Sequence, residues 1–314
     1  MNIYETALVG KSDCKITRLG LGTGPLGYLF EPVSDEVAVA TIAKAYELGI
    51  RWFDTSPLYG QGLAELRLGR ALRAFRREDI TIGTKVGYVI PCAGDILPPE
   101  ELKRDYSYDG VLRSLEGSLN RLGCGRLDIV QIHDPDNHFD EAMSGAYPAL
   151  RRLRDEGVVR AIGVGINQWQ LLVRFADAGD FDSFLCAGRY TLLDQSAAAE
   201  LLPLAKVRGI SIMAGGVFNS GILANPSADH PMFNYAPSDN RLVEYTRGLE
   251  VWCREEGVPI QAAAVQFPMT HAAVAGVLVG ARSPQEVEEN VNMARYPIPS
   301  GFWDRLEAYC RGQP

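Results

Sequence analysis

Short apolar runs alternate with longer amphipathic segments along the chain, from about residue 17 to its C-terminal end. The short runs are rich in β-branched residues, as buried strands are, and the longer segments repeat their apolar positions at the helical period. About eight strand-then-helix units follow one another in this way. The expected strands cover residues 16–22, 51–54, 80–85, 128–132, 161–164, 183–187, 210–214 and 276–279.

The clearest helices lie between these strands, at residues 35–48, 62–75, 108–122, 140–156 and 242–256. Ser34 stands where an N-cap is expected, and Gly49 and Gly123 stand at two expected helix ends. Strands that alternate with helices run parallel, and eight units of this total length close most easily into a (β/α)8 TIM barrel. A doubly wound open sheet is the alternative.

The residues outside these units predict two additions to the barrel. Residues 6–9 and the polar turn at 10–13 predict an N-terminal hairpin that closes the barrel bottom, and the C-terminal residues predict an extra helix. No linker or internal repeat divides the chain, so we expect one domain over residues 1–314. Residues 87–105 and 215–240 lack periodicity and, as strand-to-helix loops, would lie on the catalytic face.

Composition and charge narrow the choice of partner. The chain is 46% hydrophobic and 22% charged, with a net charge of −8 and no long basic run, so we expect a small-molecule partner rather than a nucleic acid or a membrane. Six separated cysteines without a C-x-x-C motif indicate neither a disulfide framework nor a zinc site. Together with the absence of a signal-like N-terminus, they predict a cytoplasmic protein. The oligomeric state stays open.

Polar side chains follow three of the expected strands at the points where these strands end. RWFDTSPLYG places Asp54 at the tip of the second strand and Tyr59 five residues further on. TIGTKVG places Lys85 at the tip of the third strand, and DIVQIHDPD places His133 at the tip of the fourth. Because functional side chains of such barrels gather at the carboxyl ends of the strands, we expect these four to meet at one rim.

The four side chains make chemical sense as one proton-transfer site. A phenol, with an ordinary pKa of about 10, is a poor acid or base near neutrality unless a cation stabilises its anion, and Lys85 offers that charge to Tyr59. Asp54 would hold the Lys85 ammonium charged in a desolvated place. His133 would donate a hydrogen bond to a substrate oxygen. The sequence therefore predicts chemistry on a carbonyl/alcohol pair.

Four separated motifs then give the chain a strong resemblance to the aldo-keto reductase superfamily. They are WFDTSPLYGQGLAELRLGRAL, the GTK at residues 83–85, the IHDP at residues 132–135 and the C-terminal VLVGARSPQEVEENV. The resemblance covers essentially the whole chain. It implies that Asp54, Tyr59, Lys85 and His133 are the catalytic tetrad. It also implies a nicotinamide cofactor bound without a Rossmann domain, with Tyr59 exchanging a proton while hydride moves to or from nicotinamide C4.

One dinucleotide motif is misleading. Residues 22–27 read GTGPLG and fit G-x-G-x-x-G, but Pro25 intervenes and the next helix signal waits until Ser34, so the motif does not open a helix. We therefore reject a Rossmann site. Gly22 and Thr23 are expected instead in a tight rim loop near the nicotinamide.

The resemblance places the other cofactor contacts in three later segments. Asn167 is expected at the carboxamide, one position away from the family's usual Ser-Asn pair. A pyrophosphate loop is expected at Phe218, Asn219, Ser220 and Gly221. The adenosine half is expected at Gly280, Arg282, Glu286, Glu289 and Asn290.

Glu286 bears on the choice of cofactor. Many NADP-specific members carry a basic residue there, and a carboxylate would repel a 2′-phosphate while accepting hydrogen bonds from ribose hydroxyls. The sequence therefore favours NAD. Arg282 keeps NADP possible, since a guanidinium can grip a phosphate as well as stack on adenine.

The acidic segment after His133 resembles a metal site only superficially. Its Asp and Pro residues are typical of a turn, and Asp140 can cap the next helix, so we expect no metal. His230 and His271 receive no role. Tyr28, Trp169 and Arg189 are the candidates for substrate contact.

Within the superfamily, GVGINQWQ and AGRYTLLDQ resemble the aldose 1-dehydrogenase branch. This resemblance implies oxidation of C1 of a cyclic aldose, of the L-fucose, L-galactose or D-threo-aldose type, to its lactone with NAD. A pyridoxal 4-dehydrogenase that forms 4-pyridoxolactone and a general NADPH-dependent carbonyl reductase are the enzymatic alternatives. A redox-sensing cofactor-binding subunit is the alternative from another class.

Overall fold

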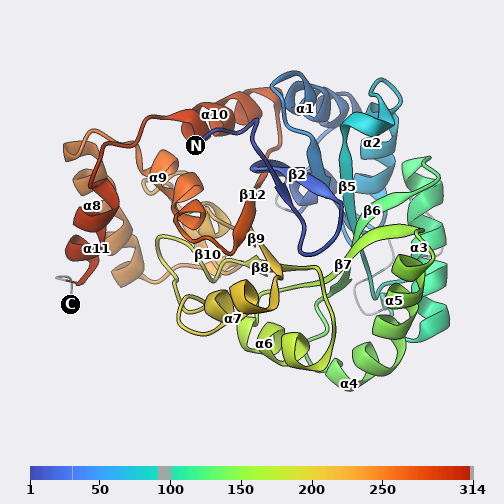
Figure 1. Cartoon of the computed structure of the whole chain (residues 1–314). Helices are drawn as coiled ribbons and strands as arrows, with labels where there is room; N and C mark the ends of the chain where they lie inside the picture. The colour runs from blue at the N-terminus through green and yellow to red at the C-terminus, as the bar shows by residue number, and fades with distance from the viewer. Residues whose placement is uncertain (30, 91–97, 99–100, 312–314) are drawn as a thin grey trace.

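The computed structural model describes residues 1–29, 31–90, 98 and 101–311. Eight parallel strands close into a barrel in which each strand pairs with the next, so the TIM barrel is confirmed and the open sheet is wrong (Figure 1). The strands are β3 (Leu19–Gly22), β4 (Trp52–Asp54), β5 (Thr81–Val86), β6 (Leu127–His133), β7 (Val159–Ile166), β8 (Ser183–Ala187), β9 (Ser211–Gly215) and β12 (Val274–Gly280). The barrel closes where β12 pairs with β3, with Val279 opposite Leu21.

Helices surround the barrel where the amphipathic segments predict them. They are α1 (Asp35–Glu47), α2 (Leu63–Leu72), α3 (Tyr108–Leu122), α4 (Phe139–Glu141), α5 (Tyr147–Asp155), α6 (Trp169–Ala178), α7 (Leu201–Arg208), α8 (Asn240–Glu255), α9 (Ile260–Gln266), α10 (Pro284–Arg295) and α11 (Phe302–Arg311). The expected helix at 140–156 contains a π turn at Ala142–Ala146. Ser34 caps α1 as expected, because its side chain accepts a hydrogen bond from the Val37 amide.

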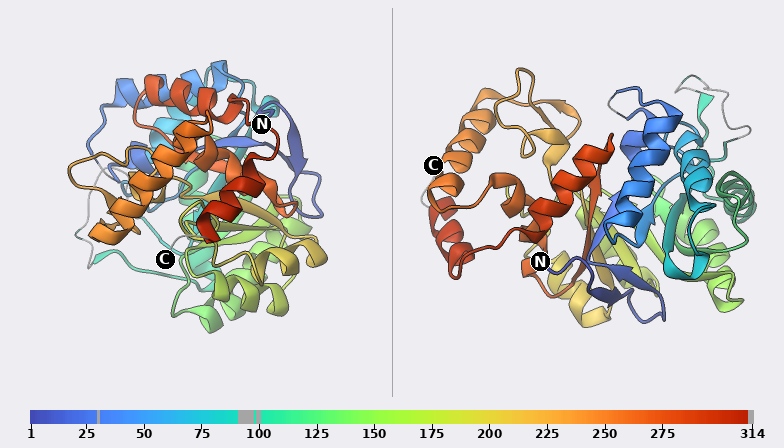
Figure 2. Two further views of the ribbon diagram at one scale, coloured as in Figure 1. Left: turned by 90° about the vertical axis from the view of Figure 1, so that its left-hand side faces the viewer. Right: turned by 90° about the horizontal axis from the view of Figure 1, so that it is seen from above.

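Two helices extend the structure beyond the barrel, on the left of Figure 1. α11 is the expected extra C-terminal helix, and it packs against α8 through Trp252, whose ring centroid lies 5.4 Å from that of Phe302 and 5.0 Å from that of Tyr309. Figure 2 shows this pair from two further directions. No helix in the described part of the chain has both the length and the apolarity to cross a membrane.

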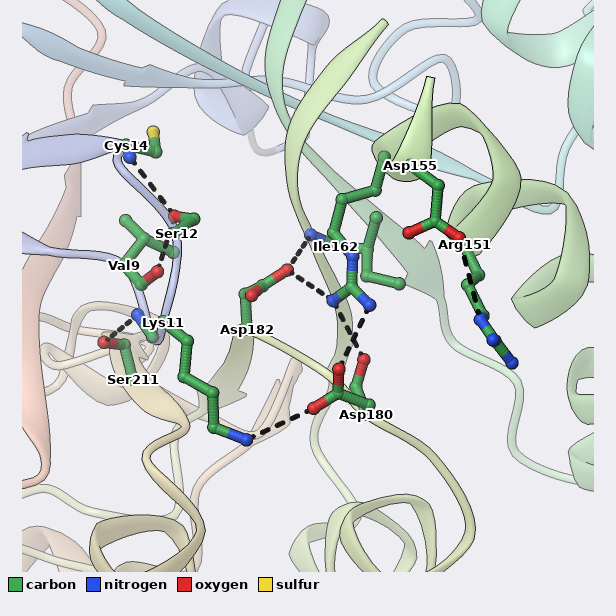
Figure 3. A network of polar contacts seen from close by, with 12 residues as sticks. Val9, Lys11, Ser12, Cys14, Arg151, Asp155, Ile162, Asp180, Asp182 and Ser211 are labelled. Carbon is green, nitrogen blue, oxygen red and sulfur yellow. Dashed lines mark hydrogen bonds and ion pairs between the residues drawn. The ribbon is translucent and has the colours of Figure 1, made fainter. Parts of the chain in front are cut away.

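The N-terminal hairpin is present and covers the amino-terminal end of the barrel. It consists of β1 (Thr6–Leu8) and β2 (Lys15–Thr17). The expected single strand at 16–22 is therefore two strands, β2 in the hairpin and β3 in the barrel. The hairpin turn is fastened to the barrel because the Gly10 amide donates to Ser211 Oγ at 2.8 Å and Lys11 pairs with Asp180 at 3.3 Å (Figure 3).

A tryptophan fills the barrel interior. Trp52 is fully buried, and two glycines make room for its ring. A Cβ atom on Gly20 would lie 2.4 Å from Trp52 Cε3, and one on Gly276 would lie 2.9 Å from Trp52 Cζ3. The interior is thus a packed core and not a pore, and side-chain chemistry is confined to the rim.

Candidate active site

The ends of three strands bring the four candidate side chains together. Asp54 is the last residue of β4, His133 is the last residue of β6, and Lys85 is the penultimate residue of β5. Tyr59 reaches the same rim from the loop between β4 and α2. Asp54, Lys85 and His133 are 3%, 1% and 6% exposed, so all three polar groups act away from bulk solvent.

Lys85 is the centre of this cluster. Its Nζ donates to Asp54 Oδ1, to the Thr55 carbonyl at 2.8 Å, and to the hydroxyl of Tyr59. These three acceptors use all three protons of the ammonium group. Burial alone would lower the pKa of Lys85, but the Asp54 carboxylate and the Tyr59 phenol more than offset it and leave the pKa above its usual value. Lys85 is therefore a fixed positive charge beside Tyr59.

The pKa of Tyr59 is raised above its ordinary value. Burial is the largest cause, because it disfavours the phenolate, and Lys85 lowers the pKa in opposition without overcoming it. Lys85 thus lowers the pKa of Tyr59 as expected, but the net shift of this pKa is upward and not downward. Before any ligand binds, Tyr59 is a protonated phenol with a cation ready to stabilise its anion.

His133 is a neutral hydrogen-bond donor. Burial is the main reason why its pKa lies well below the usual value, and the positive charges of Lys85 and Arg104 add to it. Its Nδ1 lies 3.0 Å from Ser56 Oγ, which also accepts the Leu58 amide at 3.1 Å. The Ser56 hydroxyl is then free to donate to Nδ1, so we assign the remaining proton to Nε2.

A cavity of about 300 Å³ lies over this cluster, and Tyr59, Lys85, His133 and Asp134 line it. It continues into a larger cavity of about 560 Å³. Leu29, Asn167, Leu185, Ala187 and Tyr235 line both cavities, so the two form one cleft. The tetrad thus sits where a small substrate and a longer ligand would meet.

Most of the predicted cofactor residues line the larger cavity. They are Gly22, Asn167, Phe218, Asn219, Ser220, Gly221, Gly280, Arg282 and Glu286. Thr23 does not line it, because its side chain is buried and donates to the Asp54 carbonyl. Glu289 is exposed on α10, and Asn290 donates to the Gly280 carbonyl at 3.2 Å, so neither faces the cavity.

The loop after β9 makes a tight turn along one wall of the larger cavity. Asn219, Ser220 and Gly221 have φ values of 47°, 62° and 105°, and the Asn219 and Gly221 amides donate to the Gly216 and Phe218 carbonyls within the turn. Asn219 is 3% exposed, yet its Oδ1 has no hydrogen-bond partner in the described part of the chain. A buried acceptor without a partner beside the cavity fits a hydroxyl-bearing ligand such as the ribose of a dinucleotide cofactor.

Arg282 and two carboxylates close the far end of the larger cavity. The Arg282 guanidinium donates to Glu286 Oε1 from Nη2 at 2.8 Å and to Glu31 Oε2 from Nη1 at 2.9 Å. The Arg282 amide also donates to Glu286 Oε2 at 2.8 Å. One guanidinium facing two carboxylates leaves this end of the cleft with a net negative charge.

The three candidates for substrate contact do not line either cavity. The Tyr28 hydroxyl accepts a hydrogen bond from the buried Arg67 at 3.1 Å, and Arg189 pairs with Asp194 at 2.9 Å. Trp169 begins α6 and packs against the hydrophobic core. Their side chains are engaged elsewhere in the fold.

Two residues without a predicted role, Asp134 and Tyr235, line the small cavity instead. Asp134 follows the end of β6, and the only sequence signal for it was its place directly after His133. Tyr235 lies at the turn between β10 (Met232–Phe233) and β11 (Ala236–Pro237), inside the stretch without periodicity. His230, which received no role, lines the larger cavity. In the described residues no group of three or more His, Cys, Asp or Glu side chains is arranged to hold a metal ion.

A closed parallel barrel with Asp, Tyr, Lys and His beside one extended cleft has the arrangement of a nicotinamide-dependent barrel oxidoreductase. The chain belongs to the aldo/keto reductase family, whose model matches residues 18–310. It is an NAD(P)-dependent oxidoreductase of that family.

Three curated relatives at 31–39% identity are named as dehydrogenases. The chain is 39% identical to pyridoxal 4-dehydrogenase of Microbacterium luteolum over 97% of both chains. It is 38% identical to D-threo-aldose 1-dehydrogenase of a Pseudomonas species over 93% of both chains, and 31% identical to L-galactose dehydrogenase of Arabidopsis thaliana over 93% of this chain and 88% of the relative. The resemblance to the aldose dehydrogenase branch is thereby confirmed.

Solved structures agree with the fold. The holo form of aldo-keto reductase AKR11C1 from Bacillus halodurans superposes with a TM-score of 0.76 at 26% identity, over 97% of this chain and 95% of the other. The glycerol dehydrogenase AKR11B4 from Gluconobacter oxydans gives a TM-score of 0.79 at 22% identity, over 98% and 95% of the two chains.

Proposed function

We propose that the protein oxidises C1 of a cyclic aldose to the lactone, with NAD as the acceptor. The observation that carries this proposal is the Lys85-centred cluster beneath a small cavity that contains the donor His133 and the carboxylate Asp134. Two relatives at 38% and 31% identity are named as an aldose and an L-galactose dehydrogenase, which supports a sugar as the substrate.

The cofactor would lie in the larger cavity. The left-handed loop at Asn219, Ser220 and Gly221 would bind the pyrophosphate, Gly22 and Asn167 would flank the nicotinamide, and Arg282 would contact the adenosine half. Thr23 and Asn290 would support these contacts from behind through their hydrogen bonds to the Asp54 and Gly280 carbonyls, and Glu289 lies exposed on the same helix as Glu286. Bound nicotinamide would supply the hydride acceptor.

The tetrad would handle the proton of the anomeric hydroxyl. His133 would donate from Nε2 to a substrate oxygen and fix the position of C1 at the cavity. Tyr59 would take the hydroxyl proton at its phenolic oxygen, and Lys85 would stabilise the phenolate that makes this transfer possible. Asp54 would hold Lys85 charged and in place. Because burial raises the pKa of Tyr59, oxidation is expected to speed up as the pH rises.

The acidic end of the cleft supports NAD over NADP. Glu286 and Glu31 accept hydrogen bonds from the guanidinium of Arg282, which is the cation best placed to receive a 2′-phosphate. A 2′-phosphate would have to displace these carboxylates and would be repelled by them. A ribose 2′-hydroxyl could instead donate to Glu286.

Pyridoxal is the second candidate substrate, and the 39% identity to a pyridoxal 4-dehydrogenase favours it. Its hemiacetal would lose the same proton and hydride and would give a lactone. The experiment is to follow absorbance of the reduced nicotinamide with L-fucose, L-galactose, other aldoses and pyridoxal, each with NAD and with NADP. Fast turnover of an aldose with NAD is the expected result. Turnover of pyridoxal alone would replace the proposal by the second candidate, and binding of cofactor without turnover across the panel would refute both.

A further inference from the structure

Asp134 is a carboxylate in the small cavity that the tetrad does not use. It follows directly after β6 and lies in the left-handed region at φ 44°, which few residues other than glycine, Asn and Asp adopt readily. Its amide donates to the Gly165 carbonyl at 3.0 Å, and its own carbonyl accepts the Tyr106 hydroxyl at 2.8 Å. The backbone is thus held in this conformation from two sides.

The Asp134 carboxylate lies beside the donor His133 on the wall of the small cavity. Asp134 Oδ2 lies 3.6 Å from His133 Nε2, which is too long for a hydrogen bond between them. The cavity wall therefore offers a donor and an acceptor side by side. Two hydroxyl groups on neighbouring carbons lie at a similar separation. The oxygen of one can accept from His133 while the other donates its proton to Asp134.

We propose that Asp134 recognises the hydroxyl on the carbon next to the reacting carbon, which in an aldose is the C2 hydroxyl. His133 donates to the oxygen on C1, and Asp134 accepts the proton of the hydroxyl on C2. This inference rests on the proposed oxidation of an aldose and narrows it to sugars that carry a free C2 hydroxyl.

The same geometry disfavours pyridoxal. The carbon next to its reacting carbon is a ring carbon that bears no hydroxyl, so nothing donates to Asp134 from that position. The nearest other oxygen, one carbon further on, belongs to an acidic phenol that is ionised in neutral water, and Asp134 would repel its negative charge at a partly buried site where solvent screening is reduced. The carboxylate thus separates the two candidate substrates by their chemistry.

Asp134 keeps its charge at neutral pH. Burial is the main cause that raises its pKa to about 6, and the nearby Asp136 adds to it, while Lys85 and Arg104 oppose the shift. The charged or titratable groups that face Asp134 come from several elements of the structure. They are His133, Asp136, Lys85, Arg104, Tyr106 and Tyr235.

The test compares an aldose with its 2-deoxy counterpart in the whole enzyme with NAD. Asp134→Asn keeps the shape and tolerates the left-handed backbone, and Asp134→Gly removes the side chain while keeping that backbone accessible. The matched control is Asp136→Asn, which removes a carboxylate from the same loop that does not line the cavity. Cofactor affinity and the circular dichroism spectrum report on folding.

The wild-type enzyme should prefer the aldose over its 2-deoxy counterpart in kcat/KM by roughly 10- to 100-fold, as a hydrogen bond to a charged group would give. Asp134→Gly should reduce this ratio to within about threefold of unity, mainly by raising KM for the aldose, and Asp136→Asn should keep the wild-type ratio. A ratio that is the same in the wild type and both Asp134 variants would overturn the inference and leave the proposed function intact. A wild-type enzyme that oxidises no aldose would overturn the proposed function and the inference with it.

Discussion

Replacing Glu286 by Gln should shift the enzyme from NAD toward NADP. In the structure Glu286 accepts two hydrogen bonds from the Arg282 side chain, at 3.1 Å and 2.8 Å, and Glu31 accepts a third at 2.9 Å. Gln keeps the shape of Glu286 but removes its charge, so Arg282 is released to bind an anion and one repulsive carboxylate disappears.

The size of the shift follows from Coulomb's law. At the roughly 5 Å that separates two anions sharing one guanidinium, two unit charges repel by about 0.8 kcal/mol in water and by about 3 kcal/mol at an effective dielectric constant of 20. The Glu286 and Arg282 side chains are 34% and 40% exposed, so the lower half of this range applies. About 1.4 kcal/mol corresponds to a tenfold change.

The assay is the ratio of kcat/KM for NADP to that for NAD at fixed, saturating aldose. Glu286→Gln should raise the ratio about tenfold, and Glu286→Arg should raise it further. Glu288→Gln is the control, since Glu288 lies on the same helix but pairs with Lys44 at 3.3 Å and does not line the cavity. An unchanged ratio in Glu286→Gln, or an equal rise in Glu288→Gln, would refute the reasoning.

Three further predictions concern the tetrad and the small cavity. Tyr59→Phe should bind NAD with unchanged affinity, measured by fluorescence titration, and lose about 10²- to 10⁴-fold in kcat, whereas retained activity would remove Tyr59 from its role. Lys85→Met should lower the free energy of unfolding in urea by about 3–5 kcal/mol, because it leaves Asp54 buried without its partner, and Asp54→Asn in the same chain should recover part of the loss. Since the pKa of Asp134 is raised to about 6, its ionised form is lost as the pH falls below that value, so the preference for an aldose over its 2-deoxy counterpart should decline there in the wild type. A preference that stays constant between pH 7 and pH 5 (both about one unit from that pKa) would count against this role of Asp134.

The gathering of these side chains at one rim was predictable because two simple rules determine it. The change from a β-branched run to loop residues marks the carboxyl end of each strand, and a parallel barrel brings all such ends to one rim. Asp54, Lys85 and His133 are each the polar residue at such an end, and the structure places them in contact or within one cavity. Nothing about distant parts of the chain was needed.

The position of Tyr235 was not predictable for the opposite reason. The strands on either side of it are two residues long, and Pro237 ends the second, so no periodicity marks them. The turn is held by a hydrogen bond from the Tyr235 amide to Ser220 Oγ at 3.0 Å, fifteen residues away. This tertiary contact helps to bring the ring to the boundary between the two cavities.

The break between β2 and β3 was hidden in a similar way. Thr17 and Arg18 interrupt the apolar residues of 16–22 only briefly, but the chain bends after Thr17, whose hydroxyl donates to the Leu19 carbonyl at 2.8 Å. The hydrogen-bond partner of Tyr28 was not predictable either, because the guanidinium that donates to its hydroxyl belongs to Arg67 on another helix. A local pattern carries no information about such partners.

The last strand of the barrel has a consequence for the newly made protein. β12 pairs with β3 and so joins the two ends of the sheet, and its residues Leu278, Val279 and Gly280 also form a wall of the larger cavity. While the ribosome is still extending the chain, this wall does not exist and the sheet has two open edges. On the proposed cofactor site, the dinucleotide would therefore meet its complete cavity only after synthesis has passed β12.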